Sequence, residues 1–185
     1  MLETELKCMI SAEAFERVKA AYKWNGVKTQ ENHYYSDTSG VLAENRTVFR
    51  IRKSGGTYKI QVKAHKNSAS PMQISEETEF DISNAPEIVS AEDGRRYTGL
   101  DTGELVKLGF NVTERYSFMP DENTELCLDK TSYFDITDYE VEVEYRGEYP
   151  SELIDGLKAL GVIFENEAVG KYTRFITSLR SRLSE

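Results

Sequence analysis

Charged residues alternate with uncharged ones at the start of the sequence. Glu3, Glu5 and Lys7 are separated by Thr4 and Leu6. A β-strand sends alternate side chains to opposite faces, so this spacing places two carboxylates and an ammonium group on one face. Carboxylate oxygens bind hard divalent cations, and ammonium groups bind anions. The segment therefore predicts either a charged site or an ordinary solvated face.

Both signs of charge recur on one face of the later segments. The basic residues on this face are Arg50, Arg52, Lys59, Lys63 and Arg115. The acidic residues are Glu77, Glu79, Asp81, Glu125, Asp129, Glu140, Glu142 and Glu144. The opposite face is apolar, with residues such as Phe49, Ile51, Ile60, Leu126, Val141 and Val143. A half-solvated antiparallel sheet also alternates in this way, so alternation alone leaves a wet surface and a charged interior as about equal alternatives.

The elements that must position these residues are mostly strands. Including the N-terminal segment, the period-two pattern predicts eight strands, the others at residues 32–38, 47–53, 57–63, 74–82, 110–118, 124–130 and 138–145. Hairpin turns are expected at 54–56 and 119–123. Helices are expected at 11–22, 86–93, 101–109, 150–161 and 170–183, with Ser11 and Ser151 as N-caps.

Geometry favours the charged interior. The amphipathic helices can cover the apolar side of the sheet, and eight antiparallel strands are enough to close into a barrel. Closure would turn the charged face inward, where unpaired charge is costly unless water, ions or a charged ligand is present. We therefore predict an α+β fold, in which helices pack outside a closed eight-stranded antiparallel β-barrel.

Length and composition narrow the function. The 185 residues fit a single domain, 1–185. With 32 acidic and 23 basic residues the net charge is -9, which argues against nucleic acid or an anionic membrane as partner. The sequence shows no apolar run of membrane-spanning length and no signal peptide, so we expect a cytoplasmic protein. Cys8 and Cys127 are expected to be thiols.

The charged segments also resemble, in order, the motifs of a known family. ETELK at 3–7 matches the E-x-E-x-K signature of the CYTH superfamily, also called triphosphate tunnel metalloenzymes. The segments YYSDT, FRIRK, IQVK, DYEVEVE and GKYTRF resemble that family's later motifs, and the series spans nearly the whole chain. The short signature occurs by chance, but the ordered series is specific. The closest resemblance is to small single-domain bacterial CYTH proteins.

The resemblance implies a tunnel that binds a triphosphate together with a divalent metal, Mg²⁺ or Mn²⁺. Arginines grip phosphate oxygens in pairs and lysines meet them as point charges. The expected substrate-binding residues are Lys7, Arg50, Arg52, Lys59, Lys63, Arg115 and Lys171. The expected metal ligands are Glu3, Glu5, Glu140 and Glu142, then Glu144, Glu77, Glu79 and Asp129; Glu140, Glu142 and Glu144 compete for two family positions. The expected catalytic residues are Glu3, Glu5, Lys7, Glu142 and Lys171.

Two of these assignments have alternatives, and one neighbouring position departs from the family. Lys59 could equally line the tunnel mouth. Lys171 heads the last predicted helix and could instead be a solvated helix-end lysine. Gln61 stands where a smaller threonine is more usual in the family, which leaves the fine substrate preference open.

The expected activity is metal-dependent hydrolysis of a small triphosphate. A water molecule, positioned by the metal or by a glutamate, would attack the terminal phosphoryl group. Inorganic tripolyphosphate is the favoured substrate because it needs nothing beyond the tunnel. Thiamine triphosphatase and class IV-type adenylate cyclase are alternatives within the family. A non-catalytic polyphosphate or nucleotide sensor is an alternative of another class, although it would not require the carboxylates. The sequence does not decide the oligomeric state and leaves a homodimer open.

Overall fold

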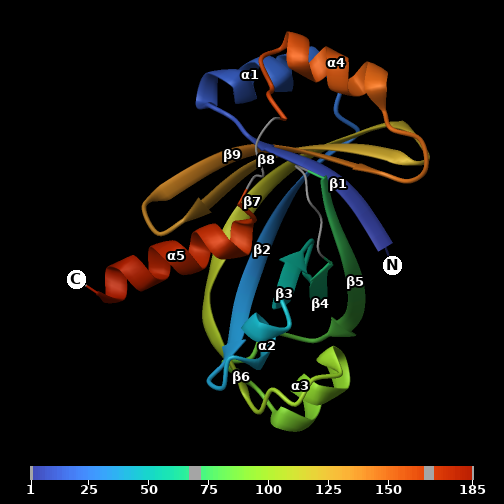
Figure 1. Ribbon diagram of the computed structural model, residues 1–185. Helices are drawn as coiled ribbons and strands as arrows, with labels where there is room; N and C mark the ends of the chain where they lie inside the picture. The colour runs from blue at the N-terminus through green and yellow to red at the C-terminus, as the bar shows by residue number, and fades with distance from the viewer. Residues whose placement is uncertain (1, 67–71, 165–168, 185) are drawn as a thin grey trace.

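The computed structural model describes residues 2–66, 72–164 and 169–184, and leaves the side chains of residues 2, 3, 66 and 72–74 outside that description. The strands of the described part are β1 (Leu2–Met9), β2 (Gly26–Asp37), β3 (Thr47–Ser54), β4 (Thr57–Lys66), β5 (Met72–Ile82), β6 (Ile88–Val89), β7 (Leu105–Asp121), β8 (Thr124–Tyr133) and β9 (Ile136–Tyr145). Its helices are α1 (Ala12–Ala21), α2 (Val41–Glu44), α3 (Ala91–Thr98), α4 (Ser151–Ala159) and α5 (Lys171–Leu183). Figure 1 shows their arrangement.

The strands form one antiparallel sheet that curls strongly (Figure 1). Within the described residues the strand order is β2-β3-β4-β5-β1-β9-β8-β7-β6, and β2 pairs in addition with β7. The eight longer strands, all but β6, therefore follow one another in a ring of hydrogen-bonded pairs. The register sets which side chains share a face: Glu142 of β9 lies opposite Lys7 of β1, and Arg50 of β3 lies opposite Gln61 of β4.

The enclosure differs from the sealed barrel that the sequence predicted. The eight longer strands range from 8 residues in β1 and β3 to 17 in β7, so their ends do not meet in a common rim. Lys59 and Glu79, near one end of β4 and β5, have side chains that are 47% and 42% exposed. The fold is thus a curled, half-barrel sheet with an open mouth, and the expectation of a closed barrel is corrected to that extent.

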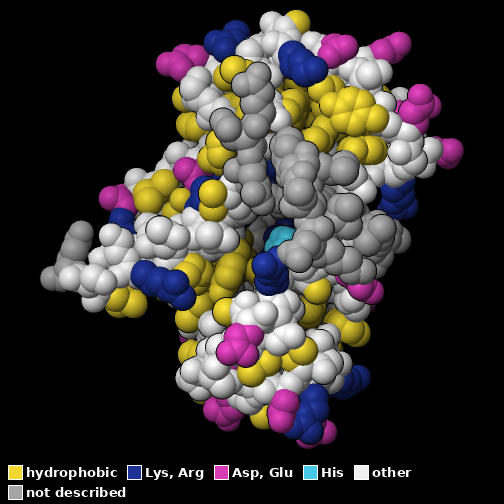
Figure 2. All heavy atoms as spheres, viewed as in Figure 1, with side chains coloured by type: hydrophobic (Ala, Val, Ile, Leu, Met, Phe, Trp, Pro, Cys, Tyr) yellow, Lys and Arg dark blue, Asp and Glu magenta, His cyan; other side chains and the backbone are white. Residues whose placement is uncertain are grey.

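Two helices cover the apolar face of β1, β8 and β9. Phe15 and Val18 of α1 and Ile154 and Leu157 of α4 are buried against this part of the sheet. Hydrophobic side chains gather around α1 and α4 in Figure 2, which shows one face of the molecule.

The starts of these two helices differ in how they are capped. Helix α1 begins as predicted, because the Ser11 hydroxyl accepts a hydrogen bond from the Ala14 amide at 3.2 Å. The predicted cap of α4 is wrong by one residue. Pro150 is the N-cap of that helix and makes no side-chain cap hydrogen bond, so Ser151 is its first helical residue.

Helices α2 and α3 cover another part of the outer face, whereas α5 lies at the inner side of the sheet. Leu42 of α2 belongs to a second apolar cluster with Phe49 and Ile51 of β3, against which Tyr97 of α3 packs. Phe175 of α5 packs against Tyr34 and Tyr133 in a third cluster. Tyr34 also lines the cavity, as do Lys171 and Tyr172 of α5, so the expectation that the helices pack outside the sheet is wrong for this helix. The other apolar strand faces point outward to α1, α2, α3 and α4, and the charged faces lie on the inside, as predicted.

Three predicted elements differ in the structure. Helix α3 begins at Ala91 with Ser90 as N-cap, whereas residues 88–89 of the predicted helix 86–93 pair with β7. The predicted helix 101–109 is wrong, because residues 105–109 begin strand β7, whose pairing with β2 outweighs the local helical spacing. Strand β2 starts at Gly26, before the predicted residue 32, and pairs with β7 over that added length. The predicted helices 11–22, 150–161 and 170–183 are confirmed as α1, α4 and α5.

Candidate functional site

A cavity of about 860 Å³ lies on the charged inner face of the sheet. The predicted site residues that line it are Glu5, Lys7, Arg50, Arg52, Lys63, Glu77, Glu79, Arg115, Glu142, Glu144 and Lys171. Asp129 and Glu140 are 0% and 1% exposed and contact the lysine that reaches into this cavity. These positions exclude the wet-surface interpretation, because the alternating charges face an internal space.

One wall of the cavity is acidic. Glu5 comes from β1, Asp129 from β8, and Glu140, Glu142 and Glu144 from β9, the strand between them. Two groups of carboxylates each bring one oxygen per residue within 4.8 Å of the others: Glu5, Glu142 and Glu144 form the first, and Asp129, Glu140 and Glu142 form the second. Glu142 belongs to both groups. Glu3 lies on β1, but its side chain is outside the described residues, so its metal assignment stays a prediction.

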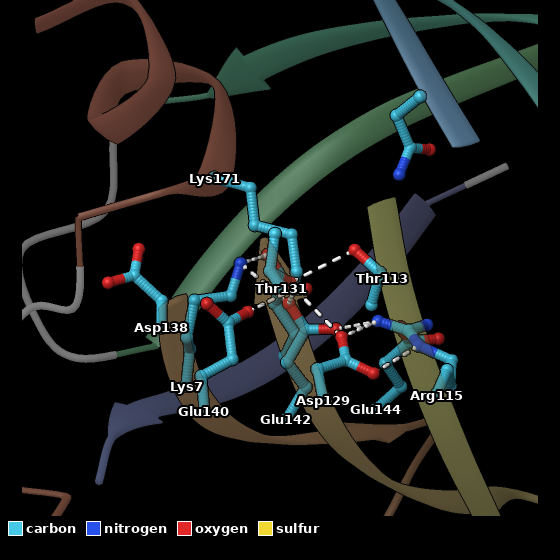
Figure 3. Close-up of polar contacts among 12 residues, drawn as sticks. Lys7, Thr113, Arg115, Asp129, Thr131, Asp138, Glu140, Glu142, Glu144 and Lys171 are labelled. Carbon is cyan, nitrogen blue, oxygen red and sulfur yellow. Dashed lines mark hydrogen bonds and ion pairs between the residues drawn. The ribbon is translucent and has the colours of Figure 1, made fainter. Parts of the chain in front are cut away.

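Two buried lysines enter the acidic wall (Figure 3). Lys171 Nζ lies 2.8 Å from an Asp129 oxygen and 2.9 Å from a Glu142 oxygen, and it also contacts Glu140. Lys7 Nζ lies 3.1 Å from Glu142 and 3.3 Å from Glu5. Burial would lower the pKa of each lysine, but the carboxylates outweigh it and raise both pKa values. The alternative of a solvated helix-end Lys171 is therefore wrong.

Arg115 completes the charge balance of the second carboxylate group. Its Nε donates to Asp129 at 2.8 Å, its Nη2 donates to the other Asp129 oxygen at 2.6 Å, and it also contacts Glu142. This paired geometry is the strong form of an arginine–carboxylate contact. Lys171 and Arg115 thus compensate the carboxylates at the bottom of the cavity.

The pKa values of the carboxylates diverge. Burial would raise the pKa of Glu142, but Lys171, Lys7 and Arg115 hold it well below its usual range. Burial raises the pKa of Glu144, with only Arg115 acting in the opposite direction as a main contributor. Glu144 therefore lies where a further cation would be favourable.

The opposite wall is basic. Counted around the ring of pairs, β3 is four strands from β9 in either direction, and it carries Arg50 and Arg52 on its inner face. Arg50 Nε donates to Gln61 Oε1 at 2.8 Å, and Arg52 Nε donates to Asn32 Oδ1 at 2.8 Å. Burial, with Arg50 and Arg115 nearby, lowers the pKa of Arg52 to about 9. An anion placed in the cavity would offset this repulsion.

Three predicted residues lie outside the carboxylate groups. Glu79 contacts Lys59 at 2.9 Å and Gln61 at the exposed mouth, and neither Lys59 nor Glu79 approaches the two carboxylate groups in the described contacts. Glu77 lies 3.6 Å from Arg50. The sequence predicts Glu77 and Glu79 as further metal ligands. In the structure both carboxylates instead lie beside basic residues.

Several lining residues were missed from the sequence. Lys28, Gln30, Asn32 and Tyr34 alternate along β2 and line the cavity. The period-two signal was present there, but the predicted strand began too late to include the first two. Arg174 of α5 contacts Asp138 at 2.7 Å and also contacts Glu140. It lies three residues after Lys171, a helical spacing that places both side chains on one side of α5.

The family comparison agrees with this geometry. The model of the CYTH domain family matches residues 1–160. The chain belongs to the CYTH domain family. A CYTH relative in Bacillus subtilis (strain 168), YjbK, is named as a candidate triphosphatase; it is 26% identical over 151 residues, which cover 77% of this chain and 77% of YjbK.

Solved structures show the same fold. HpAC1 from Hippeastrum, described as a candidate adenylyl cyclase with a dominant triphosphatase activity, matches with a TM-score of 0.75 and 24% identity over 95% of this chain and 96% of HpAC1. A candidate adenylate cyclase (bh2851) from Bacillus halodurans matches with a TM-score of 0.69 and 23% identity over 94% of this chain and 96% of that chain. Among the described residues of this CYTH chain, no helix is both long and apolar enough to cross a membrane.

Proposed function

We propose that this chain is a metal-dependent triphosphatase that acts on small triphosphates, with inorganic tripolyphosphate as the favoured substrate and phosphate as the product. The observation that carries the proposal is the opposition of an acidic wall on β1, β8 and β9 to a basic wall on β3 within one cavity. A triphosphate would neutralise the charge of the basic wall, and a divalent cation would bridge the triphosphate to the carboxylates of the acidic wall. The names of YjbK and HpAC1 support the same activity.

The residues present fit a hard divalent cation. The group of Glu5, Glu142 and Glu144 offers only carboxylate oxygens, and these lie close enough together to share one ion. Oxygen ligands of this kind suit Mg²⁺ or Mn²⁺. When bound, such an ion would neutralise phosphate charge and hold the substrate in place. Lysines already contact Asp129, Glu140, Glu142 and Glu5, whereas the nearest cation to Glu144 in the described contacts is Arg115 at 3.9 Å, so we assign the metal to the first group.

The chain's own residues would bind and orient the substrate. Arg50 and Arg52 would hold phosphate oxygens, with Lys63 beside them on β4. Lys7, which contacts Glu5 and Glu142, would bind a phosphate oxygen at the end of the substrate nearest the metal ion. A carboxylate not used by the cation would orient the attacking water. We further propose that the curled sheet surrounds the triphosphate as a tunnel.

A release assay tests the proposal. Purified protein is incubated with tripolyphosphate, thiamine triphosphate, ATP or GTP in Mg²⁺ or Mn²⁺, and phosphate, pyrophosphate and cyclic nucleotide are scored separately. We expect phosphate from tripolyphosphate. Cyclic nucleotide with pyrophosphate would instead identify a cyclase, and tight binding without any product would identify a sensor; either result would overturn the proposal.

A further inference from the structure

The inner arginines differ in the chemistry of their partners. Arg115 is held at Nε and Nη2 by the carboxylate of Asp129. Arg52 is held at Nε by the neutral amide oxygen of Asn32, at 2.8 Å. Among the residues that the structure describes, no carboxylate oxygen lies within 4.0 Å of Arg52. Arg115 is thus compensated by direct contact, whereas Arg52 has a neutral partner and meets the charge of Glu77 only at longer range.

A relay of buried groups fixes Asn32. Strand register places Asn32 of β2 directly opposite Arg52 of β3 and Asn111 of β7. The Asn32 amide nitrogen donates to Asn111 Oδ1 at 3.0 Å, and the Asn111 nitrogen donates to the Tyr34 hydroxyl at 3.1 Å. These three residues are at most 1% exposed. Because Asn32 Nδ2 is occupied by Asn111, its oxygen must face Arg52.

Holding an arginine at Nε has a geometric consequence. The guanidinium group is planar, so fixing Nε orients the two terminal nitrogens, and these are the pair that can meet two oxygens of a phosphate. An amide acceptor fixes this orientation without cancelling the positive charge. A carboxylate in the same place would fix the orientation but would also compete with the phosphate for the charge.

We propose that Asn32 is a positioning residue that orients Arg52 for the triphosphate while leaving its charge available. The inference rests on the proposed function for the identity of the anion. Gln61 occupies the matching place beside Arg50, but Glu79 accepts from its amide and Glu77 lies 3.6 Å from Arg50, so the neutral arrangement is clearest at Asn32.

Two variants of Asn32 separate orientation from charge. Asn32→Asp keeps an acceptor for Arg52, and a turn of the Asn111 amide preserves the remaining hydrogen bonds: its Nδ2 would donate to the new carboxylate and its Oδ1 would accept from Tyr34. Asn32→Ala removes the acceptor and adds no charge. A purely structural role predicts that Asn32→Asp resembles wild type and that Asn32→Ala is worse in every measurement. The proposal predicts that Asn32→Asp is the more stable of the two variants and that Asn32→Ala binds tripolyphosphate more tightly.

The experiment is calorimetric titration of tripolyphosphate in Mg²⁺, with thermal melts of each variant. We expect affinity to fall about ten-fold in Asn32→Ala and on the order of a hundred-fold in Asn32→Asp, while Asn32→Ala has the lower melting temperature. Lys53→Met, on the outer face of β3, is the control for nonspecific effects on that strand. Affinity in Asn32→Asp equal to wild type, or higher than in Asn32→Ala, would overturn the inference and leave the proposed function standing.

A second measurement does not depend on the substrate. The Nε–H proton of Arg52, observed by NMR, should exchange slowly in wild type and in Asn32→Asp and rapidly in Asn32→Ala. Fast exchange in wild type would overturn the positioning role. Failure of wild type to bind tripolyphosphate, with slow exchange retained, would instead count against the proposed function and leave the orientation of Arg52 established.

Discussion

Arg52 offers the sharpest test of the basic wall, through the substitution Arg52→Met. Methionine keeps much of the side-chain length and removes the charge. A hydrogen bond to a charged group contributes about 1.5–3 kcal/mol, and about 1.4 kcal/mol corresponds to a factor of ten. Loss of one phosphate contact should therefore weaken tripolyphosphate binding roughly ten- to a hundred-fold, and should lower turnover further if the contact tightens in the transition state.

The same substitution should have little effect on stability. Arg52 is half-buried, donates to Asn32 at 2.8 Å, and has no carboxylate partner within 4.0 Å in the described residues. The lost hydrogen bond, worth about 1.5–3 kcal/mol because Arg52 is charged, is largely offset by removing a desolvated charge that neighbouring arginines repel. We therefore expect the free energy of unfolding to change by no more than about 1 kcal/mol.

Lys53→Met is the matched control. Lys53 follows Arg52 on β3 and lies on the outer face, with its Nζ 5.8 Å from the centroid of the Tyr58 ring. Titration calorimetry with tripolyphosphate and Mg²⁺ measures affinity, and thermal melts check folding. Equal, small changes in affinity for Arg52→Met and Lys53→Met would refute the assignment of the basic wall to phosphate binding.

The remaining predictions concern the acidic wall. Glu142→Gln should abolish Mn²⁺ binding in calorimetry while the protein stays folded, and excess EDTA should abolish turnover of wild type; activity that persists in chelator would contradict the metal assignment. Lys171→Met should destabilise the fold by about 3–5 kcal/mol in urea unfolding, because it removes the ammonium that the buried carboxylates of Asp129, Glu140 and Glu142 share; an unchanged midpoint would contradict this. Because the pKa of Glu142 is lowered below its ordinary 4.5, its stabilisation is complete above that pH and is lost as pH falls through the lower, folded pKa. Wild type should therefore lose stability in acid more steeply than Glu142→Gln, and parallel curves in pH-dependent melts would count against this.

Alternation predicted the inner face well because it depends only on the period of a strand. Glu5, Lys7, Arg50 and Arg52 all line the cavity, as their spacing indicated. Strand spacing does not predict which residues pair across strands, because pairing depends on the register between strands that are distant in sequence. Nothing local indicates that Asn32 lies opposite both Arg52 and Asn111, so the relay could not be predicted from the sequence.

The wrong prediction of a helix at residues 101–109 has a related cause. Residues 101–109 include helix-forming residues at helical spacing, but there the chain pairs with β2. A register shift falls between Tyr34 and Tyr35, opposite Gly109, whose φ of +138° suits glycine. Tertiary pairing of this kind overrides local propensity, and the sequence offers only the glycine as a sign of it.

The two carboxylate groups share Glu142 but differ in what compensates them. Asp129 and Glu140 are 0% and 1% exposed and already meet Lys171, and each also meets an arginine, Arg115 or Arg174. Buried carboxylates are tolerated only with such partners, so this group can fold without metal. Glu144 is more exposed, with 31% of its side chain accessible, and its nearest cation in the described contacts is Arg115 at 3.9 Å. A small cation entering the cavity would therefore be most favourable beside Glu144, the least compensated carboxylate of the two groups.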